Sequence, residues 1–290
     1  MQSRFFLASL AGVGFVSVSS LVYFLQEKLI YIPDFPSKEY RDPDQNPQLY
    51  RNPGERQIPY ENIQVPTKDG LLLHGWHLKQ NPDSPTIVFF QANAGNIGMR
   101  MDNLEEFYRE LGANVVAVSY RGYGKSPGYP SEPGLMKDAE ATMEYLKSAN
   151  VDFTKLFVFG RSLGGAVGIY FAWKFPGVRG LILENTFMSI SAMVDHIVPR
   201  ASWALKPLLR NHWPSIERIA EVKTPICFIS GRKDELVPPF HMDRLYEHSL
   251  KSKFKEMHFV NYGDHNFTYN TAGKHYIEWV KNFMKKALES

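Results

Sequence analysis

Ser162 stands in the motif Gly160-Arg161-Ser162-Leu163-Gly164, between a strand-like apolar run at 156–159 and helix-like residues at 166–174. Glycines on both sides of a serine in this setting permit a very tight turn, which lifts the hydroxyl above the end of the strand. The following helix directs the positive end of its dipole at the serine and favours developing negative charge there. We therefore predict that Ser162 is a nucleophile; the alternative is a helix-capping serine in a glycine-rich turn.

A serine hydroxyl is a weak nucleophile, so this chemistry requires a general base near Ser162. His265 lies in the turn at residues 262–266, after a strand-like run and before the closing helix-like residues 275–287. In folds that carry this serine motif, the chain order is nucleophile, acid and then histidine. We predict that His265 is the base; the alternative is a histidine of a surface loop.

An acidic side chain after a late strand holds the imidazole of such a histidine in its productive tautomer. Asp234 follows the strand-like residues 225–229, and we predict that it completes a Ser-His-Asp triad. Glu184 ends the strand-like residues 180–183 and is the alternative acid. If Glu184 is not the acid, it is expected to form hydrogen bonds at the end of its own strand.

The tetrahedral intermediate of acyl transfer carries an oxyanion that needs well-placed hydrogen-bond donors. One predicted donor is the backbone N–H of Leu163, the residue after the nucleophile. The loop at residues 91–96 follows an early strand, and its predicted donor is the backbone N–H of Asn93. For the side chains of Gln91 and Asn96, hydrogen bonds inside the loop are the favoured explanation.

These residues require a sheet whose strands end at a common edge. Asp-Gly at residues 69–70 lies between two strand-like runs and predicts an opening antiparallel hairpin. Short apolar runs then alternate with helix-like stretches, as in strands buried on both faces of a parallel sheet. The predicted strands lie at residues 63–65, 71–76, 86–90, 115–119, 156–159, 180–183, 226–230 and 256–260. We predict an α/β fold with a mostly parallel, doubly wound sheet and a ligand site at the carboxyl ends of its strands.

Residues 5–25 form a run of 21 residues without a charged side chain, and a helix of roughly 20 apolar residues spans a bilayer. We predict a retained membrane anchor at residues 1–26, because the run is longer than the apolar core of a cleaved signal peptide. A cleaved signal peptide and a helix buried in the domain are the alternatives. Arg4 precedes the run, which favours a single-pass, type II topology in the endoplasmic reticulum or another endomembrane.

Six prolines between Tyr31 and Tyr60 predict an extended juxtamembrane segment at residues 27–60 that lies along the domain surface. The catalytic domain is predicted at residues 61–290. Within it, residues 187–224 are rich in Met, Trp, Leu and Ile and form a cap-like insertion. This insertion is expected either to wall an apolar acyl pocket or to pack on the domain as an ordinary amphipathic helix.

The chain has 290 residues, is 44% hydrophobic and carries a net charge of +3, which suits one large globular domain and argues against nucleic-acid binding. Cys227 is the single cysteine, so no intramolecular disulfide forms, and it fits a buried strand position. His74 and His77 lie three residues apart on a predicted strand and point to opposite faces, which is poor metal-ligand geometry. We predict no metal ion and no cofactor, and no oligomeric state follows from the sequence.

Several motifs together resemble the α/β-hydrolase-domain-13-like family, also called the bud-emergence BEM-type hydrolases. The shared stretches are residues 93–98, 120–126, 160–166, 184–187 and 263–266, and the resemblance runs from about residue 60 to the end. It implies the α/β-hydrolase fold, a triad of Ser162, Asp234 and His265, a single-pass membrane topology and an acyl ester or thioester hydrolase. Relatives in the wider group look like protein depalmitoylases.

One pair departs from the family pattern, which reads His-Gly before Asn-Ala-Gly-Asn, whereas this chain has Gln91-Ala92. Alanine is tolerated there only at negative φ, so the pair brings the oxyanion geometry into question. The expected function is a membrane-anchored serine hydrolase that acts on acyl ester or S-acylated substrates at a lipid bilayer. The alternatives are a serine peptidase, which needs an open cleft, and a catalytically weak membrane scaffold.

Asn266-Phe267-Thr268 forms an N-glycosylation sequon directly after His265. A glycan there would obstruct the predicted site. Either the domain faces the cytosol, or folding hides Asn266, or the three-residue pattern is accidental. The last two explanations are favoured because the pattern is common.

Overall fold

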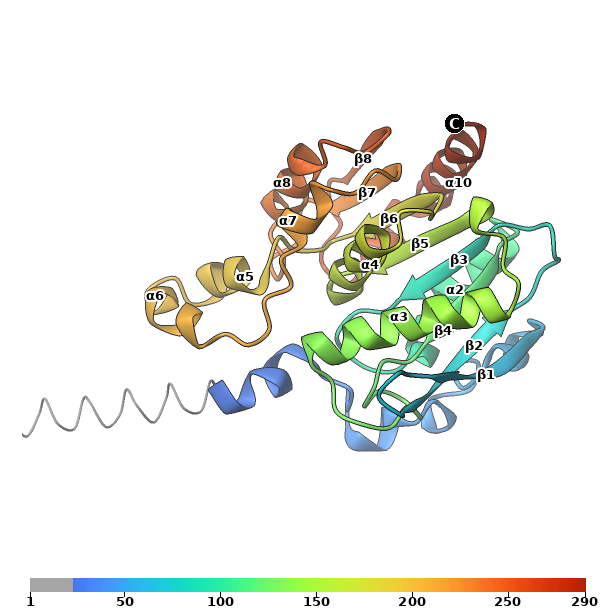
Figure 1. Cartoon of the computed structure of the whole chain (residues 1–290), viewed down its shortest axis with the longest axis horizontal. Helices are drawn as coiled ribbons and strands as arrows, with labels where there is room; N and C mark the ends of the chain where they lie inside the picture. Colours follow the sequence, from blue (N-terminus) through green and yellow to red (C-terminus); the bar gives the residue numbers. More distant parts are fainter. Residues whose placement is uncertain (1–22) are drawn as a thin grey trace, which may run out of the picture.

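A computed structural model describes residues 23–290 of the chain, and an eight-stranded sheet forms its centre. The strand order is β1-β2-β4-β3-β5-β6-β7-β8; β2 is antiparallel to both of its neighbours, and every other pair is parallel. The strands are β1 (Tyr60–Pro66), β2 (Leu72–Leu78), β3 (Thr86–Phe90), β4 (Asn114–Val118), β5 (Leu156–Arg161), β6 (Gly180–Glu184), β7 (Ile226–Gly231) and β8 (Lys255–Val260). The predicted sheet with its opening hairpin is confirmed, and the predicted strand ends agree to within a few residues (Figure 1).

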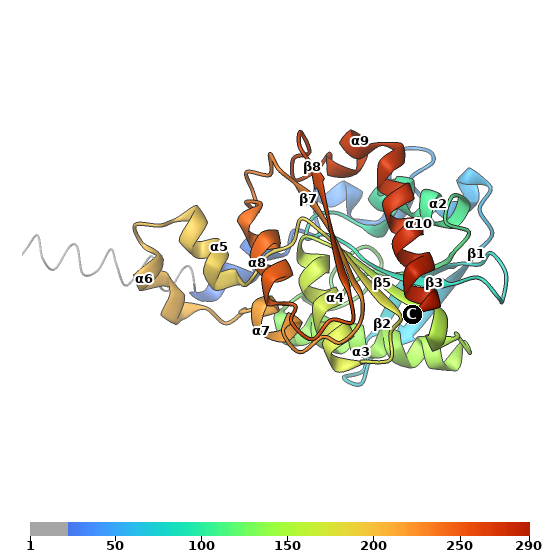
Figure 2. The same cartoon turned by 90° about the horizontal axis from the view of Figure 1, so that it is seen from above.

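Helices cover both faces of the sheet, and β3, β4, β5 and β6 are therefore buried along their whole length. Val88 and Phe90 of β3 point into one core, and Ile87 and Phe89 point into the other. The first core is closed by α3, α4 and α8, and the second by α2 and α10 (Figure 2). The α-helices are α2 (Met101–Arg109), α3 (Glu132–Ser148), α4 (Leu163–Lys174), α5 (Ile190–Ile197), α6 (Ser202–Leu205), α7 (Ser215–Ile219), α8 (Phe240–His248), α9 (Thr268–Ala272) and α10 (Lys274–Glu289).

The chain leaves the sheet between β6 and β7 and forms the short helices α5, α6 and α7. Figures 1 and 2 show α5 and α6 at one end of the molecule, beside the helical residues 23–30. The Tyr31 hydroxyl donates to Asn211 Oδ1 (2.8 Å), and the indole N–H of Trp213 donates to the Tyr31 oxygen (3.1 Å). The chain after the predicted anchor is therefore fastened to this insertion.

Residues 1–22 of the predicted anchor lie outside the described residues, and residues 23–30 are helical. Three short 3₁₀ helices follow before the sheet begins: η1 (Lys38–Arg41), η2 (Pro43–Gln45) and η3 (Pro53–Arg56). Prolines open η2 and η3, where the missing N–H costs no hydrogen bond. Within residues 23–290, no helix combines the length and the apolar character needed to cross a bilayer.

A buried ion pair joins the loop after β4 to α3. Arg121 donates to the Asp138 carboxylate through both its Nε and its backbone N–H (2.8 Å each). Its remaining guanidinium nitrogens donate to Asp69 in the β1–β2 turn at 2.9 and 3.1 Å. Burial raises the pKa of Asp138 to about 6, although the hydrogen bonds and charge of Arg121 oppose the rise. One arginine therefore ties the hairpin, the β4 loop and α3 together.

We expect Asp138→Ala to lower the free energy of unfolding by about 3 kcal/mol or more, because it removes the buried carboxylate that accepts from both the Nε and the backbone N–H of Arg121. Urea denaturation measures the change. Glu144→Ala on the same helix is the matched control: Glu144 pairs with Lys147, both side chains are more than half exposed, and the expected loss is about 0.5 kcal/mol or less. Equal losses in the two variants would contradict a role for the buried pair.

Candidate active site

Ser162 is the single residue between β5 and α4, and its backbone lies at φ 54° and ψ −121°. A side chain at positive φ strains the backbone, so the surroundings must hold this conformation. The Ser162 N–H donates to the carbonyl oxygen of Glu184 (2.9 Å), and its own carbonyl oxygen accepts from the Thr186 hydroxyl (2.7 Å). The end of β6 therefore fixes the serine at the amino terminus of α4.

Glycines are required around this turn because other atoms occupy the space that a Cβ would need. A Cβ on Gly160 would overlap the backbone of Gly164, and a Cβ on Gly164 would overlap the carbonyl oxygen of Phe90. A Cβ on Gly165 would overlap the side chain of Thr186. The turn thus packs backbone against backbone on the loop after β3, and it packs directly against the Thr186 side chain after β6.

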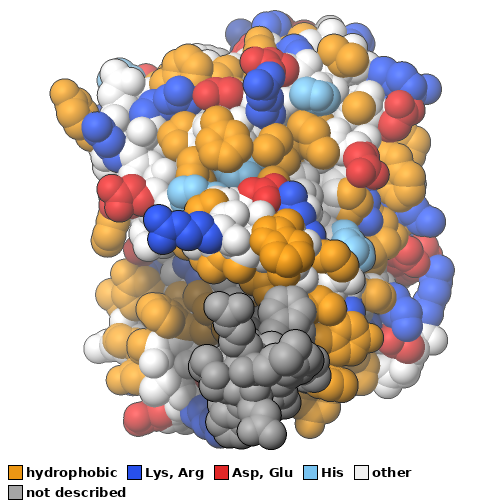
Figure 3. Space-filling view, turned by 90° about the vertical axis from the view of Figure 1, so that its left-hand side faces the viewer, with side chains coloured by type: hydrophobic (Ala, Val, Ile, Leu, Met, Phe, Trp, Pro, Cys, Tyr) orange, Lys and Arg blue, Asp and Glu red, His pale blue; other side chains and the backbone are white. Residues whose placement is uncertain are grey.

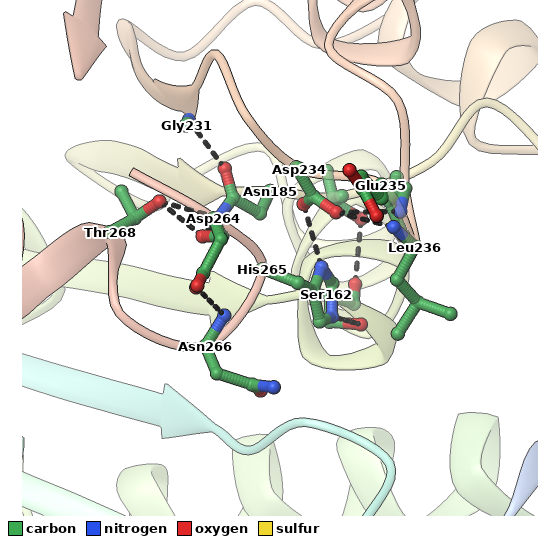
Figure 4. Close-up of polar contacts among 12 residues, drawn as sticks. Ser162, Asn185, Gly231, Asp234, Glu235, Leu236, Asp264, His265, Asn266 and Thr268 are labelled. Atoms are coloured by element: carbon green, nitrogen blue, oxygen red, sulfur yellow. Dashed lines mark hydrogen bonds and ion pairs between the residues drawn. The ribbon is translucent and has the colours of Figure 1, made fainter. Parts of the chain in front are cut away.

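The structure brings the three predicted triad residues together (Figure 4). His265 Nε2 lies 3.1 Å from Ser162 Oγ, and His265 Nδ1 lies 2.7 Å from Asp234 Oδ2. All three residues are buried, where a hydrogen bond is electrostatically stronger than in water. An N–H on Nδ1 that donates to Asp234 leaves Nε2 able to accept the serine proton, which is the tautomer that a general base requires.

Asp234 faces the imidazole, and the alternative acid Glu184 does not. The second carboxylate oxygen of Asp234 accepts from the backbone N–H groups of Leu236 (3.0 Å) and Val237 (2.8 Å). Glu184 instead accepts from the hydroxyl of Tyr276 (2.6 Å) on α10. The geometry thus favours Asp234 and gives Glu184 the hydrogen-bonding role that was its alternative.

The loop that carries His265 is held by contacts that no motif indicated. The carbonyl oxygen of Asp264 accepts from the Thr268 hydroxyl (2.6 Å) and from the side-chain amide of Asn185 (3.1 Å). Asn185 Oδ1 in turn accepts from the N–H of Gly231 (2.8 Å) at the end of β7. Asn185 therefore joins the histidine loop to the loop that carries the acid (Figure 4). The sequence signal that could have indicated this role is the position of Asn185, a polar residue directly after the buried strand β6.

The two predicted oxyanion donors lie in segments that pack against each other. Gly164, in the first turn of α4, packs against the carbonyl groups of Phe90 and Gln91 after β3. Neither the N–H of Leu163 nor that of Asn93 donates to an acceptor among residues 23–290. Both groups therefore lack an acceptor within the described residues, as a donor to an oxyanion must.

Residues near the N-terminus hold the loop that contains Asn93. The carbonyl oxygen of Asn93 accepts from the N–H of Ile32 (2.9 Å) and from the Tyr123 hydroxyl (2.8 Å). The N–H of Gly95 donates back to Ile32 (3.0 Å), and the side-chain amide of Asn93 donates to the carbonyl oxygen of Ile30 (3.0 Å). The chain after the predicted anchor thus pairs with this loop like a short parallel strand.

The other two polar side chains of this loop, Gln91 and Asn96, differ in where their partners lie. Gln91 Nε2 donates to the carbonyl oxygen of Gly95 (3.4 Å), and Asn96 Oδ1 accepts from the N–H of Gly98 (2.8 Å). The loop-internal hydrogen bonding expected for both is therefore confirmed for Gln91 only. The side-chain amide of Asn96 donates outside the loop, to the carbonyl oxygen of Tyr40 (2.8 Å) and to Asn46 Oδ1 (3.0 Å). Ala92 does not have a positive φ, so the condition for tolerating its Cβ is met.

Two arginines support the loops around the triad. Arg161 donates to the carbonyl oxygen of His265 (2.6 Å), and Arg100 donates to the carbonyl oxygen of Ala94. Burial, followed by the charge of Arg161, lowers the pKa of Arg100 to about 10, so Arg100 stays cationic at neutral pH. Hydrogen bonds from charged donors are stronger than neutral ones, and both loops are held by such a bond.

His74 and His77 form hydrogen bonds within the domain, and Cys227 is a buried strand residue. His74 Nε2 lies 3.2 Å from Asn62 Oδ1, and His77 Nδ1 lies 2.8 Å from the Tyr145 hydroxyl. Cys227 is buried in β7. In the part of the chain that the structure describes, no group of three or more His, Cys, Asp and Glu side chains is arranged to hold a metal ion.

Curated relatives match this chain over nearly its whole length. The alpha/beta hydrolase domain-containing protein WAV2 of Arabidopsis thaliana is 40% identical over 95% of this chain and 92% of its own length. Protein bem46 of Schizosaccharomyces pombe is 36% identical over 96% of this chain and 91% of its own length. The chain belongs to the bem46-type α/β-hydrolase family. An uncharacterized membrane protein of Saccharomyces cerevisiae is 37% identical over 97% of this chain and 96% of its own length.

A family profile described as serine aminopeptidase, S33, matches residues 87–218, the stretch from β3 to α7. Among solved structures, an alpha-beta hydrolase from Vibrio vulnificus has a TM-score of 0.71 at 20% identity and covers 90% of this chain and 92% of its own. The Pyrococcus furiosus esterase Pf2001 has a TM-score of 0.69 at 20% identity, with 82% and 94% covered. At that identity the likeness shows the α/β-hydrolase fold.

Gly164→Ala tests the close approach of α4 to the loop after β3. The added methyl group would overlap the Phe90 carbonyl oxygen, and we expect the free energy of unfolding to fall by roughly 2 kcal/mol. Gly177→Ala is the matched control, because nothing lies within 4 Å of its Cβ position, and its stability should hold or rise slightly. Urea denaturation compares the two; equal stability would show that the turn accommodates a side chain.

Proposed function

We propose that this member of the bem46-type family is a serine hydrolase that cleaves acyl esters or thioesters through Ser162, His265 and Asp234. The hydrogen-bonded relay from Ser162 Oγ through the imidazole to the buried Asp234 carboxylate carries the proposal. The strained turn at Ser162 supports it, because such a turn presents the hydroxyl at the top of the sheet.

In the first half-reaction, Ser162 Oγ attacks the acyl carbonyl carbon while His265 Nε2 takes the hydroxyl proton. Asp234 stabilises the resulting imidazolium through the N–H on Nδ1. The tetrahedral intermediate then breaks its C–O or C–S bond, and the imidazolium gives its proton to the departing alcohol or thiol. The acyl group remains on Ser162 as an ester.

In the second half-reaction, a water molecule attacks the acyl-enzyme carbonyl and gives a proton to His265. The second intermediate releases the carboxylic acid, and the proton returns to Ser162 Oγ. In both half-reactions the proposed oxyanion donors are the backbone N–H groups of Leu163 and Asn93. The amino terminus of α4 adds its dipole to this stabilisation.

The insertion between β6 and β7 supports an apolar acyl group as substrate. Within α5, Ile190 and Met193 are buried, and His196 Nε2 lies 3.1 Å from the carbonyl oxygen of Glu235 in the acid loop. The insertion thus lies beside the triad, where it can wall an acyl chain. The predicted anchor and the yeast relative named as a membrane protein support an ester or S-acylated substrate at an endomembrane, with a single-pass, type II topology.

A peptidase is the second candidate, because the matching profile is described as a serine aminopeptidase. The same triad and oxyanion donors serve amide hydrolysis. A substrate panel of acyl esters, acyl thioesters and peptide amides on the purified protein separates the two candidates. Preferential turnover of the peptide amides would overturn the ester and thioester proposal.

Ser162→Ala is expected to abolish labelling by a fluorophosphonate and to lower ester turnover by about 10⁴-fold or more, because no nucleophile remains. Labelling and kcat of the purified full-length protein are the measurements. Ser148→Ala, a change at an exposed serine, is the matched control and should keep both. A wild-type protein that takes no label and cleaves no panel substrate would favour the scaffold alternative instead.

Asn93→Pro and Asn93→Ala separate the backbone donor from the side chain. Proline removes the N–H, and we expect kcat to fall by about 10²–10³-fold with little change in KM. Alanine keeps the N–H and loses only the side-chain hydrogen bond to Ile30, so its kcat should stay within about tenfold of wild type. Thermal unfolding measures whether both variants are folded. Equal losses of kcat in the proline and alanine variants would contradict a role for the Asn93 N–H as an oxyanion donor.

A further inference from the structure

Exposed apolar side chains from two distant parts of the sequence gather at one end of the molecule. They come from the helical residues 23–30 and from α5, α6 and their connection: Tyr23, Phe24, Leu29, Ile197, Val198 and Trp203. Trp203 is 75% exposed and Phe24 is 70% exposed. We call these six side chains the apolar surface. Figure 3 views this end of the molecule and shows hydrophobic side chains at its lower left and lower right. A gathering of exposed apolar side chains on one face is typical of an interaction site.

Polar contacts hold the two parts of the apolar surface together. Gln26 Oε1 accepts from the N–H of Arg210 (2.7 Å), and Gln26 Nε2 donates to the carbonyl oxygen of Leu208 (3.1 Å). The Arg210 guanidinium lies 4.8 Å from the centre of the Tyr23 ring and pairs with Glu27. The apolar surface is therefore built by the fold, and its two halves keep one position relative to each other.

Basic side chains border the apolar surface. Residues 187–214 contain Arg200, Lys206 and Arg210 but only one acidic residue, Asp195. Lys206 pairs with Asp195 and Arg210 pairs with Glu27, whereas Arg200 has no carboxylate partner among residues 23–290. Exposed tryptophan and tyrosine next to cationic side chains are typical of surfaces that lie in the interface of an anionic bilayer.

The position at which the predicted anchor joins the domain indicates what contacts the apolar surface. The uncharged run at residues 5–25 ends inside the apolar surface, which includes Tyr23 and Phe24. An anchor that joins the domain at this point keeps the apolar surface next to the bilayer. A membrane is thus favoured over a second copy of the chain.

We propose that the apolar surface docks on an anionic lipid bilayer and so presents the triad to acyl chains at the membrane, an inference that rests on the proposed function. The contact between His196 and Glu235 places α5 against the acid loop. Leu236 in that loop is exposed, as is Ile197 at the end of α5. Apolar side chains thus continue from the docking surface toward Asp234.

The docking is tested on full-length protein in nanodiscs of phosphatidylcholine and phosphatidylserine. An environment-sensitive fluorophore is attached at Trp203→Cys, and Lys285→Cys on α10 is the control at the opposite end of the molecule (Figure 2). The native Cys227 is buried and does not compete for the label. We expect a blue shift and quenching by nitroxide-labelled lipids at position 203 only.

Two results would overturn the docking. One is lipid quenching that is absent at position 203 or equal at the two positions. The other is a blue shift at position 203 without lipid quenching but with energy transfer between labelled copies, which assigns the apolar surface to a second copy of the chain. Nanodiscs without phosphatidylserine measure the contribution of the basic border, and quenching there should be weaker.

Activity provides the second measurement. Two rates are compared: turnover of a long-chain ester in the bilayer and turnover of a short soluble ester. We expect the double variant Ile197→Ser with Trp203→Ser to lower the ratio of the first rate to the second by about tenfold, because two large apolar side chains are lost from the membrane contact. Leu250→Ser is the matched control, because Leu250 is 77% exposed but lies in the loop after α8, and its ratio should equal that of wild type. An unchanged ratio in the double variant overturns the inference. A wild-type protein that cleaves neither ester while position 203 is quenched supports the docking and overturns the proposed function.

Discussion

Gly164 and the carbonyl oxygen of Phe90 approach so closely that α4 starts directly against the loop after β3. This contact sets the spacing between Ser162, at the amino terminus of α4, and the loop that carries Asn93. The positive φ of Ser162 follows, because the chain must pass from β5 to α4 within one residue. Strain of this kind costs about 1–3 kcal/mol, and the hydrogen bonds that Ser162 makes to the end of β6 help to offset it. A sheet packed on both faces leaves the turn no room to relax.

Ser162, Asp234 and His265 could be located from the sequence because each follows a strand that reads as an apolar run. Neighbouring parallel strands end at one edge of the sheet, so their order along the chain translates into proximity. The role of Asn185 could not be found in this way. Its amide reaches Asp264 and Gly231 only after β6, β7 and the histidine loop have come together, and such a contact leaves no periodic signal.

The sequence after the predicted anchor, at residues 31–60, indicated even less about its tertiary contacts than the sequence around Asn185 did. Prolines correctly indicated that long helices are absent between residues 31 and 60. The segment is not extended as predicted, because it forms three short 3₁₀ helices, and the prolines did not indicate what it contacts. Ile32 uses both its N–H and its carbonyl oxygen on the loop after β3, while the neighbouring Tyr31 directs its hydroxyl at Asn211 in the insertion. Two successive residues thus connect the insertion to the loop that holds Asn93. Hydrogen bonds of this long range depend on tertiary placement, which the composition of the segment does not encode.

These outside contacts also explain how Gln91-Ala92 can replace the His-Gly of the family pattern. The carbonyl oxygen of Gln91 accepts from the Tyr120 hydroxyl (3.0 Å), and that of Asn93 accepts from Ile32 and Tyr123. The peptide group between Ala92 and Asn93 therefore lies between two peptide planes that are fixed from outside the loop. Because each peptide group is rigid and planar, the direction of the N–H of Asn93 is restricted by its neighbours and does not depend on a glycine. The substitution is therefore compatible with the donor geometry that the proposed mechanism needs. Alanine at negative φ also reduces the conformational freedom of the unfolded chain relative to glycine.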